Sequence, residues 1–370
     1  MSPSHDPGSP YRRATLAPRD EAPRVAPPTG TWRLALPGGR AVLVDRRASA
    51  ANLGLAAVLL IVAWLSLCLG GVPLSPLEAG RALFGHGEPM TVFVVQELRL
   101  MRLAAGLATG GAFALAGCLM QTLARNRLAT PGIIGIDNGA TAFAVASVVG
   151  LGVSIAPPAM ALAGAATATA ITFGLAGGAG TRGYRFIVAG IGVGAVFGAL
   201  TQLLLARVAI DTANAAYPWT IGSLNARDGE ALGVLVVGLA LGLVAAQWLT
   251  RPLAVLRFSD SVAQGLGIRV RACRYLALGL AVALTALAVA VAGPVGLVAL
   301  IGPEIARHLS SPRGVPLVGS ALAGALVMVA ADLAGRLALA PIEVPVGIVT
   351  AIVGGPMLLW ILLSPAMRRH

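Results

Sequence analysis

Apolar stretches of about 20 residues recur along the chain from residue 50 onward, and they constrain its fold more than any other feature. A helix rises ~1.5 Å per residue, so a stretch of this length crosses a hydrocarbon core of ~30 Å. Such segments must satisfy their backbone hydrogen bonds internally, which favours helices. The pattern predicts ten spans, at about 50–70, 103–123, 134–152, 157–177, 186–207, 231–250, 274–293, 294–309, 316–336 and 344–363.

Composition supports an all-α integral membrane protein. Hydrophobic residues make up 57% of the chain and charged residues 11%, against roughly 25% charged residues in soluble domains. The formal net charge of +12 could suggest nucleic acid as a partner. However, every basic side chain is arginine, and most arginines lie in short segments between apolar runs. Because topology signals have this distribution, we expect membrane lipid as a partner and no nucleic acid.

The arginine distribution also predicts an orientation. An even number of spans places both termini on the same side of the membrane. If that side is the cytoplasm, 21 of the 27 basic residues lie inside, as the positive-inside rule requires. We therefore expect a multi-pass membrane protein with both termini in the cytoplasm. The six exceptions are Arg81, Arg99, Arg102, Arg207, Arg227 and Arg336.

Two domains follow from this organisation. Residues 1–46 are rich in Pro, Arg and small polar residues and lack the apolar run of a secretory signal. They predict a cytoplasmic, largely disordered tail with a short ordered piece at 32–39. The tail could be a regulatory or targeting arm or an unselected extension. Residues 47–367 form the predicted ten-helix transmembrane domain.

The few ionisable residues within spans, chiefly Glu304, Arg307 and Asp332, are sparse and near span ends. Linked buried charges mark proton paths in secondary transporters, so a proton-coupled carrier is one alternative. The sequence has no HExxH motif, no paired carboxylates within a span and no Ser/His/Asp arrangement, so we expect no catalytic residues and no enzyme. The three cysteines and four histidines lack metal-ligand spacing, which predicts no metal site.

The chain has no GxxxxGK[ST] loop to cradle phosphates, so ATP could power transport only through a second polypeptide. That partner needs a docking surface, and the polar segment 251–274 is the candidate. Val262 and Leu266 lie at i and i+4, which indicates a short amphipathic helix from Phe258 that GlyLeuGly at 265–267 would end. The alternative is an anchoring loop whose arginines only set topology.

Four segments carry a family likeness that covers about residues 45–365. The segments are ArgLeuMetArgLeu at 99–103; Gly117, Gln121 and ArgAsnArgLeuAlaThrProGlyIleIleGlyIleAspAsnGlyAla at 125–140; Trp219, Gly222, Ser223 and Leu224; and GlyProValGlyLeuValAlaLeuIleGlyProGluIleAlaArg at 293–307, continuing through Ala331, Asp332 and Arg336 to GluValProValGlyIleValThrAlaIleValGlyGlyPro at 343–356. In these segments the chain resembles the FecCD-type permease subunits of ABC importers for ferric siderophores, haem and vitamin B12. The resemblance implies that residues 47–367 are a permease domain in the bacterial plasma (inner) membrane.

The resemblance implies the type II ABC importer permease fold, with ten helices per subunit. It also implies a dimer with a second permease subunit, two ATPase subunits and an extracytoplasmic solute-binding protein, with no cofactor bound by this chain. The family's cytoplasmic loop inserts into a groove on the ATPase, and the matching residues are Asp260, Ala263, Leu266 and Gly267.

In the family, three outward arginines receive acidic residues of the binding protein, and Arg99, Arg102 and Arg336 match them. The alternative for each is a lone arginine that reaches the lipid headgroups.

Two positions depart from the family pattern. The usual ProHis is Pro303–Glu304 here, and the usual AsnPro is Asn126–Arg127. With the basic lead-in at 32–47, these departures resemble the second permease of catecholate-siderophore systems of the enterobactin type, which act as halves of heterodimers. The resemblance therefore implies iron transport as a catecholate siderophore. A haem or cobalamin permease and a homodimer are the alternatives within the family.

Overall fold

The structure, a computed structural model, describes residues 29–35, 41–150, 155–176, 184–225, 228–310 and 314–363. The chain divides into two compact units, Met1–Arg46 and Arg47–His370. In the first unit, strands β1 (Thr31–Ala35) and β2 (Ala41–Asp45) pair antiparallel, an addition to the all-α prediction. The strands overlap the ordered piece predicted at 32–39. Most of the predicted disordered tail lies outside the described residues.

A helix coincides with each of the ten predicted spans. These helices are α1 (Arg46–Cys68), α4 (Met101–Ala124), α5 (Ile136–Val149), α6 (Pro157–Leu175), α7 (Tyr184–Ala206), α10 (Gly229–Leu256), α12 (Val270–Ala292), α13 (Val298–Leu309), α14 (Leu317–Leu337) and α15 (Val346–Leu363).

Length separates these helices into two groups. By length and composition, seven described helical stretches could cross a membrane: α1, α6, α7, α10, α12, α14 and the continuous stretch Pro89–Ala124 that ends with α4. Helix α5 has 14 residues, α13 has 12, and α15 contributes a shorter apolar stretch, Val346–Met357. The helical membrane architecture is thus confirmed, whereas the count of ten spans is not confirmed and stays a prediction.

Short helices connect the long ones. Helix α2 (Pro76–Leu83) begins with a capping box, in which the Ser75 backbone N–H donates to Glu78 at 2.9 Å and the Glu78 backbone N–H donates to the Ser75 hydroxyl. These hydrogen bonds with Ser75 hold the pKa of the Glu78 carboxyl below its ordinary value. The other short elements are α3 (Pro89–Phe93), the π-helical segment η2 (Val94–Leu100), the 3-10 helix η3 (Pro131–Ile134), α8 (Ile210–Ala216), α9 (Pro218–Ile221) and α11 (Asp260–Gly265).

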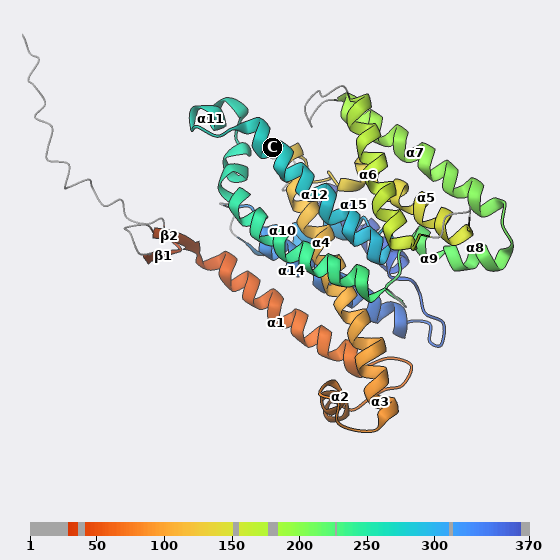
Figure 1. Cartoon of the computed structure of the whole chain (residues 1–370). Helices are drawn as coiled ribbons and strands as arrows, with labels where there is room; N and C mark the ends of the chain where they lie inside the picture. Colours follow the sequence, from red (N-terminus) through yellow and green to blue (C-terminus); the bar gives the residue numbers. More distant parts are fainter. Residues whose placement is uncertain are drawn as a thin grey trace, which may run out of the picture. The chain divides into compact units, whose positions relative to one another are not determined.

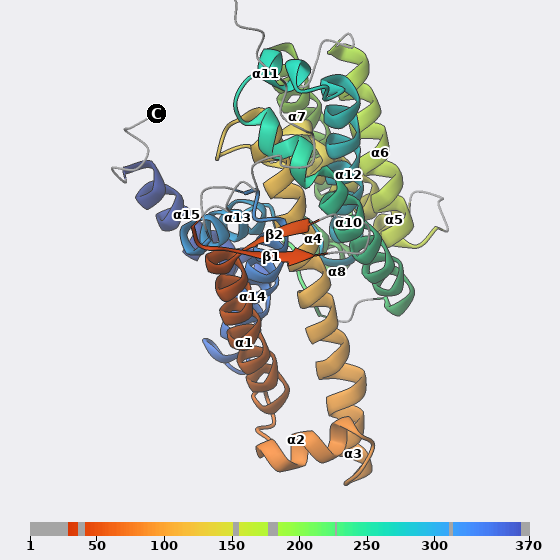
Figure 2. The ribbon, with the colours of Figure 1, turned by 90° about the vertical axis from the view of Figure 1, so that its left-hand side faces the viewer.

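Helix α4 is the most buried of the long helices and packs against α10, α12, α13 and α14 (Figures 1 and 2). Small residues permit this close packing, as the four-residue spacing of Gly106 and Gly110 suggests. A Cβ atom added at Gly110 would lie 2.4 Å from the backbone oxygen of Gly324 in α14. The two backbones therefore touch directly. Helices α5, α6 and α7 pack against one another on one side of this group (Figures 1 and 2).

The outward surface of the long helices is apolar. Helix α10 exposes a series of large apolar side chains: Val234, Val237, Leu241, Val244 and Trp248. Only a solvent as apolar as lipid makes such a surface tolerable, because water would penalise its area. The exposed face of α10 therefore supports a membrane location independently of the interior.

The long helices end near α2 on one side and near α11 on the other (Figure 1), and different polar residues line the cavities at these two ends. The end of α1, the starts of α4, α10 and α15 and the end of α14 meet beside α2, and we call this the α2 end. The ends of α4, α10 and α13 and the start of α14 meet near α11, and we call this the α11 end. Both sets of predicted site residues lie at these ends.

Candidate functional site

Helix α11 has its own start and stop signals. The Ser259 hydroxyl accepts a hydrogen bond from the backbone N–H of Val262 and so caps the helix. The helix ends at Gly265, and Gly267 has a φ of 79°, in the left-handed region that favours glycine. The predicted short helix and its termination by GlyLeuGly are therefore confirmed.

The four predicted coupling residues occupy different environments. Ala263 is fully buried, whereas Leu266 is 67% exposed. The Asp260 carboxylate accepts from Arg125 at 3.0 Å and from Arg274 at 2.7 Å. Asp260 thus ties α11 to the end of α4 and the start of α12.

An exposed apolar ridge remains on α11 and its flanks. Phe258, Val262 and Leu266 recur every four residues, and all three are exposed. We call them the α11 ridge. Phe258 is a ridge residue that the sequence reasoning did not include among the coupling positions, although its spacing from Val262 was visible. The ridge is an exposed apolar surface on a helix that the Asp260 ion pairs hold in place. Surfaces of this kind insert into the groove of a partner protein.

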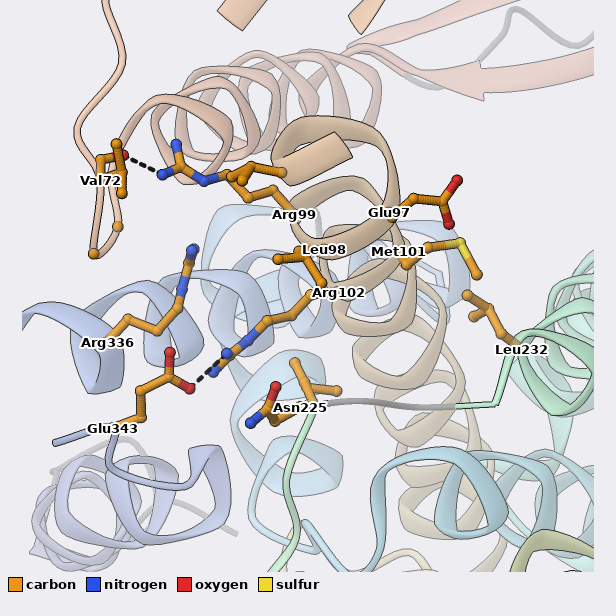
Figure 3. Close-up of a pocket in the computed structure, with 14 residues that line it drawn as sticks. Val72, Glu97, Leu98, Arg99, Met101, Arg102, Asn225, Leu232, Arg336 and Glu343 are labelled. Carbon is orange, nitrogen blue, oxygen red and sulfur yellow. Dashed lines mark hydrogen bonds and ion pairs between the residues drawn. The ribbon is translucent and has the colours of Figure 1, made fainter. Parts of the chain in front are cut away.

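At the α2 end, the three predicted docking arginines line one cavity of about 480 Å³. Figure 3 shows Arg99, Arg102 and Arg336 together with Glu343 around this space. The residues come from η2, α4, α14 and the segment before α15. The structure therefore brings together three arginines that lie up to 237 positions apart in the sequence (336 − 99).

Two of these arginines are buried and hold the end of α1. Arg99 donates to the backbone oxygens of Leu67 and Cys68 at 2.7 and 3.0 Å, and it also contacts the backbone oxygen of Val72 (Figure 3). Arg336 donates to the Ser66 hydroxyl at 2.6 Å. The two bonds from Arg99 to Leu67 and Cys68 satisfy carbonyl groups that the end of α1 leaves without helical partners.

Arg102 sits between two carboxylates. Its Nε lies 2.9 Å from Asp332, and its Nη1 lies 2.7 Å from Glu343, the contact dashed in Figure 3. Asp332 is buried and also pairs with Arg336 at 3.2 Å, whereas the Glu343 side chain is 46% exposed. The sequence reasoning included neither carboxylate as a partner of these arginines, although both lie within the motifs that carry the resemblance.

At the α11 end, the two departures from the family pattern are partners. Glu304 in α13 is 2% exposed, and its carboxylate lies 3.3 Å from Arg127 and 2.9 Å from Arg307. Arg307 also donates to the side-chain oxygen of Gln121 in α4. The cluster therefore links α4, the segment after α4 and α13.

Glu304 and Asp332 are thus paired with arginines. Each has two arginine partners, and the two residues lie at opposite ends of the long helices rather than in one linked chain of charges across them. Within the described ranges, no group of three or more His, Cys, Asp and Glu residues could hold a metal ion. The three cysteines are free and buried.

Comparisons with known proteins agree with these features. The FecCD transport family matches residues 58–364. The chain is 36% identical to the achromobactin transport system permease protein CbrC of Dickeya dadantii, over 85% of this chain and 91% of CbrC. It is 33% identical to the ferric enterobactin transport system permease protein FepG of Escherichia coli, over 89% of this chain and 100% of FepG. It is also 33% identical to the iron(3+)-hydroxamate import system permease protein FhuG of Bacillus subtilis, over 83% of this chain and 94% of FhuG.

A solved structure is similar as well. It is a chain of a metal-chelate type ABC transporter in an inward-facing conformation, with a TM-score of 0.75, 26% identity and coverage of 85% of this chain and 99% of that chain. The fold, the matched range and the relatives agree. The chain therefore belongs to the FecCD transport family and is a multi-pass inner-membrane permease subunit of an ABC importer, not an enzyme.

Proposed function

We propose that this permease carries a ferric siderophore into the cytoplasm and that the siderophore is a catecholate of the enterobactin type. The observation that carries the proposal is the similarity to FepG along that protein's whole length. The Arg127–Glu304 pair adds support, because it joins the two departures that resemble the enterobactin-type permease. CbrC and FhuG are named for other chelates, so the test must compare chelate classes.

The alternatives differ in energy source or substrate. A haem or cobalamin permease of the same family would keep every motif, so only measured uptake separates it from the proposal. A proton-coupled carrier would need no ATPase. Family membership and the arginine-paired carboxylates favour ATP-driven transport.

Uptake in proteoliposomes tests the proposal. The chain is reconstituted with its second permease, its ATPase and its binding protein, and uptake is measured for radioactive iron as a catecholate, a hydroxamate or a citrate chelate, and for radiolabelled haem and cobalamin. We expect ATP-dependent uptake of the catecholate chelate and little of the others. Preferential uptake of hydroxamate, citrate, haem or cobalamin would overturn the substrate assignment, and uptake that follows a proton gradient without ATP would overturn the transport class.

The α11 ridge is the proposed contact with the ATPase. The tethered Asp260, the buried Ala263 and the turn at Gly267 hold the helix, and Leu266 with its neighbours enters the partner's groove. Leu266→Ser should release the ATPase during purification and abolish transport. The matched control is Leu77→Ser on α2, where the side chain is 65% exposed at the other end. Normal ATPase retention by the Leu266 variant would contradict the contact.

The α2 end is the proposed contact with the binding protein. Of the three arginines, Arg102 is best placed to pair with a carboxylate of the binding protein. One of its two partners is the exposed Glu343, which an incoming carboxylate could replace. Arg99 and Arg336 support the end of α1 and add positive charge beneath the contact. Charge reversal at Arg102 should weaken capture of the binding protein and reduce its salt dependence. Salt-dependent affinity equal to that of the unsubstituted permease would contradict this contact.

The remaining parts follow from the family. We propose two ATPase subunits and a heterodimer with a second permease, with a homodimer as the alternative that subunit analysis of the purified importer distinguishes. We also propose that the chain binds no cofactor and that iron crosses while chelated.

A further inference from the structure

A second cavity, of about 440 Å³, lies at the α11 end, and the residues of the α11 ridge are not among its lining residues. Its walls come from the end of α4 and the residues after it, the end of α10, α13 and the residues before α14. Four of its lining residues are arginines: Arg125, Arg127, Arg257 and Arg307. Among the lining residues none is acidic.

The described lining of this cavity is basic. Arg125 pairs with Asp260, and Arg127 and Arg307 pair with Glu304, but neither carboxylate is among the described lining residues. Arg257 donates to the backbone oxygen of Gly314 at 3.2 Å. The described lining thus carries four arginines and no carboxylate.

The positive-inside rule does not explain the convergence. That rule requires arginines in the segments between spans, but it does not require arginines from three separate segments to line one hollow. Uncharged polar residues, Gln121, Thr122 and Asn126, complete much of the wall. Guanidinium groups pair with phosphate through parallel N–H donors, and basic pockets between membrane helices attract acidic headgroups.

We propose that this cavity binds a phosphate group. The group belongs either to the headgroup of an anionic phospholipid or to a soluble phosphate compound, because the recognition chemistry is the same. A bound phosphate would offset the positive charge of the lining and bridge the ends of α4, α10 and α13. It would thereby act on the segment from Arg257 that leads directly into α11.

Binding by the intact importer tests the proposal in two arms. In the lipid arm, native mass spectrometry counts phosphatidylglycerol bound to the importer from nanodiscs that contain phosphatidylcholine with or without phosphatidylglycerol. In the soluble arm, calorimetry in pure phosphatidylcholine nanodiscs measures binding of inorganic phosphate. Arg257→Gln removes one lining charge at the end of α10 and keeps a polar side chain there. The matched control, Arg271→Gln, removes an exposed charge at the start of α12 that does not line the cavity.

We expect Arg257→Gln to weaken binding about tenfold in one arm, as for loss of one charge-assisted contact, while Arg271→Gln leaves it unchanged. The arm that responds identifies the source of the phosphate. Arg127→Gln provides a second lining variant if the first does not fold. Equal binding by lining and control variants in both arms would overturn the proposal, as would a lining variant that loses only the ATPase.

Discussion

Removing the Glu304 charge is the sharpest test of how the α11 end is held together. Glu304→Gln keeps the volume of the side chain but leaves Arg127 and Arg307 without their shared carboxylate. Loss of one partner of a fully buried ion pair costs about 3–5 kcal/mol, and exposed pairs are worth about 0.2–1 kcal/mol. The arginine side chains are 37% and 21% exposed, so water can solvate them in part. We therefore expect an intermediate loss of about 2 kcal/mol of unfolding free energy.

The buried cysteines provide the assay. All three are free and buried, so a thiol-reactive dye reports unfolding of the purified importer as its temperature rises. A loss of about 2 kcal/mol should lower the midpoint by roughly 4 °C, given about 2 °C per kcal/mol for a large chain. Arg127→Gln alone should cost less, because Glu304 keeps Arg307.

The double variant decides whether the two residues are coupled. In the Glu304→Gln background, Arg127→Gln removes a cation that no longer has its carboxylate. It should therefore be neutral or stabilising in that background although it destabilises the unsubstituted chain. If Arg127→Gln lowers the midpoint equally in both backgrounds, the two residues act independently and the reasoning fails.

Three further outcomes follow from local geometry. Gly117→Ala should destabilise the permease by more than about 2 kcal/mol in the same thermal assay, because the new Cβ would lie 1.9 Å from a backbone oxygen of α13. Its control is Gly192→Ala, where an added Cβ would have no neighbouring atom within 4 Å. Glu343→Gln should tighten binding-protein capture about fivefold by releasing Arg102 from an exposed pair, and equal or weaker capture would contradict a competing role. Ser259→Ala should cost about 1 kcal/mol of local stability in α11 and speed its hydrogen exchange; unchanged exchange would show that the cap does not support the helix.

The sequence predicted the elements better than their lengths. Apolar runs located a helix at each expected span, because lipid permits few other structures. They overestimated α13, predicted from residue 294, because GlyProValGly at 293–296 is apolar but does not continue the helix, which begins at Val298. The shortened α5 is similar, since Pro131 and Gly135 place η3 and a left-handed residue before the helix starts at Ile136.

Side-chain partners were beyond a single sequence. The departures at Arg127 and Glu304 are 177 positions apart, and only the packing of α13 against α4 and the segment after it makes them an ion pair. The bonds from Arg99 and Arg336 to the end of α1 were not predictable either. Their acceptors are backbone oxygens, which every residue type carries. The α11 helix, by contrast, was predictable because its cap, spacing and glycine stop are all local.

The charge at the two ends supports the predicted orientation and suggests a direct test. The cavity at the α2 end is lined by three arginines and two glutamates, Glu97 and Glu343, whereas the described lining of the cavity at the α11 end has four arginines and no acidic residue. The positive-inside rule therefore predicts that α11 faces the cytoplasm. Leu77→Cys and Leu266→Cys introduce thiols at equally exposed sites, and the native cysteines are buried. The assay uses cells that lack the ATPase and whose outer membrane has been opened, so that a reagent reaches the outer face of the inner membrane. A membrane-impermeant maleimide should label Leu77→Cys at once. It should label Leu266→Cys only after the inner membrane is permeabilised. The reverse order would place α11 outside, where no contact with a cytoplasmic ATPase could form.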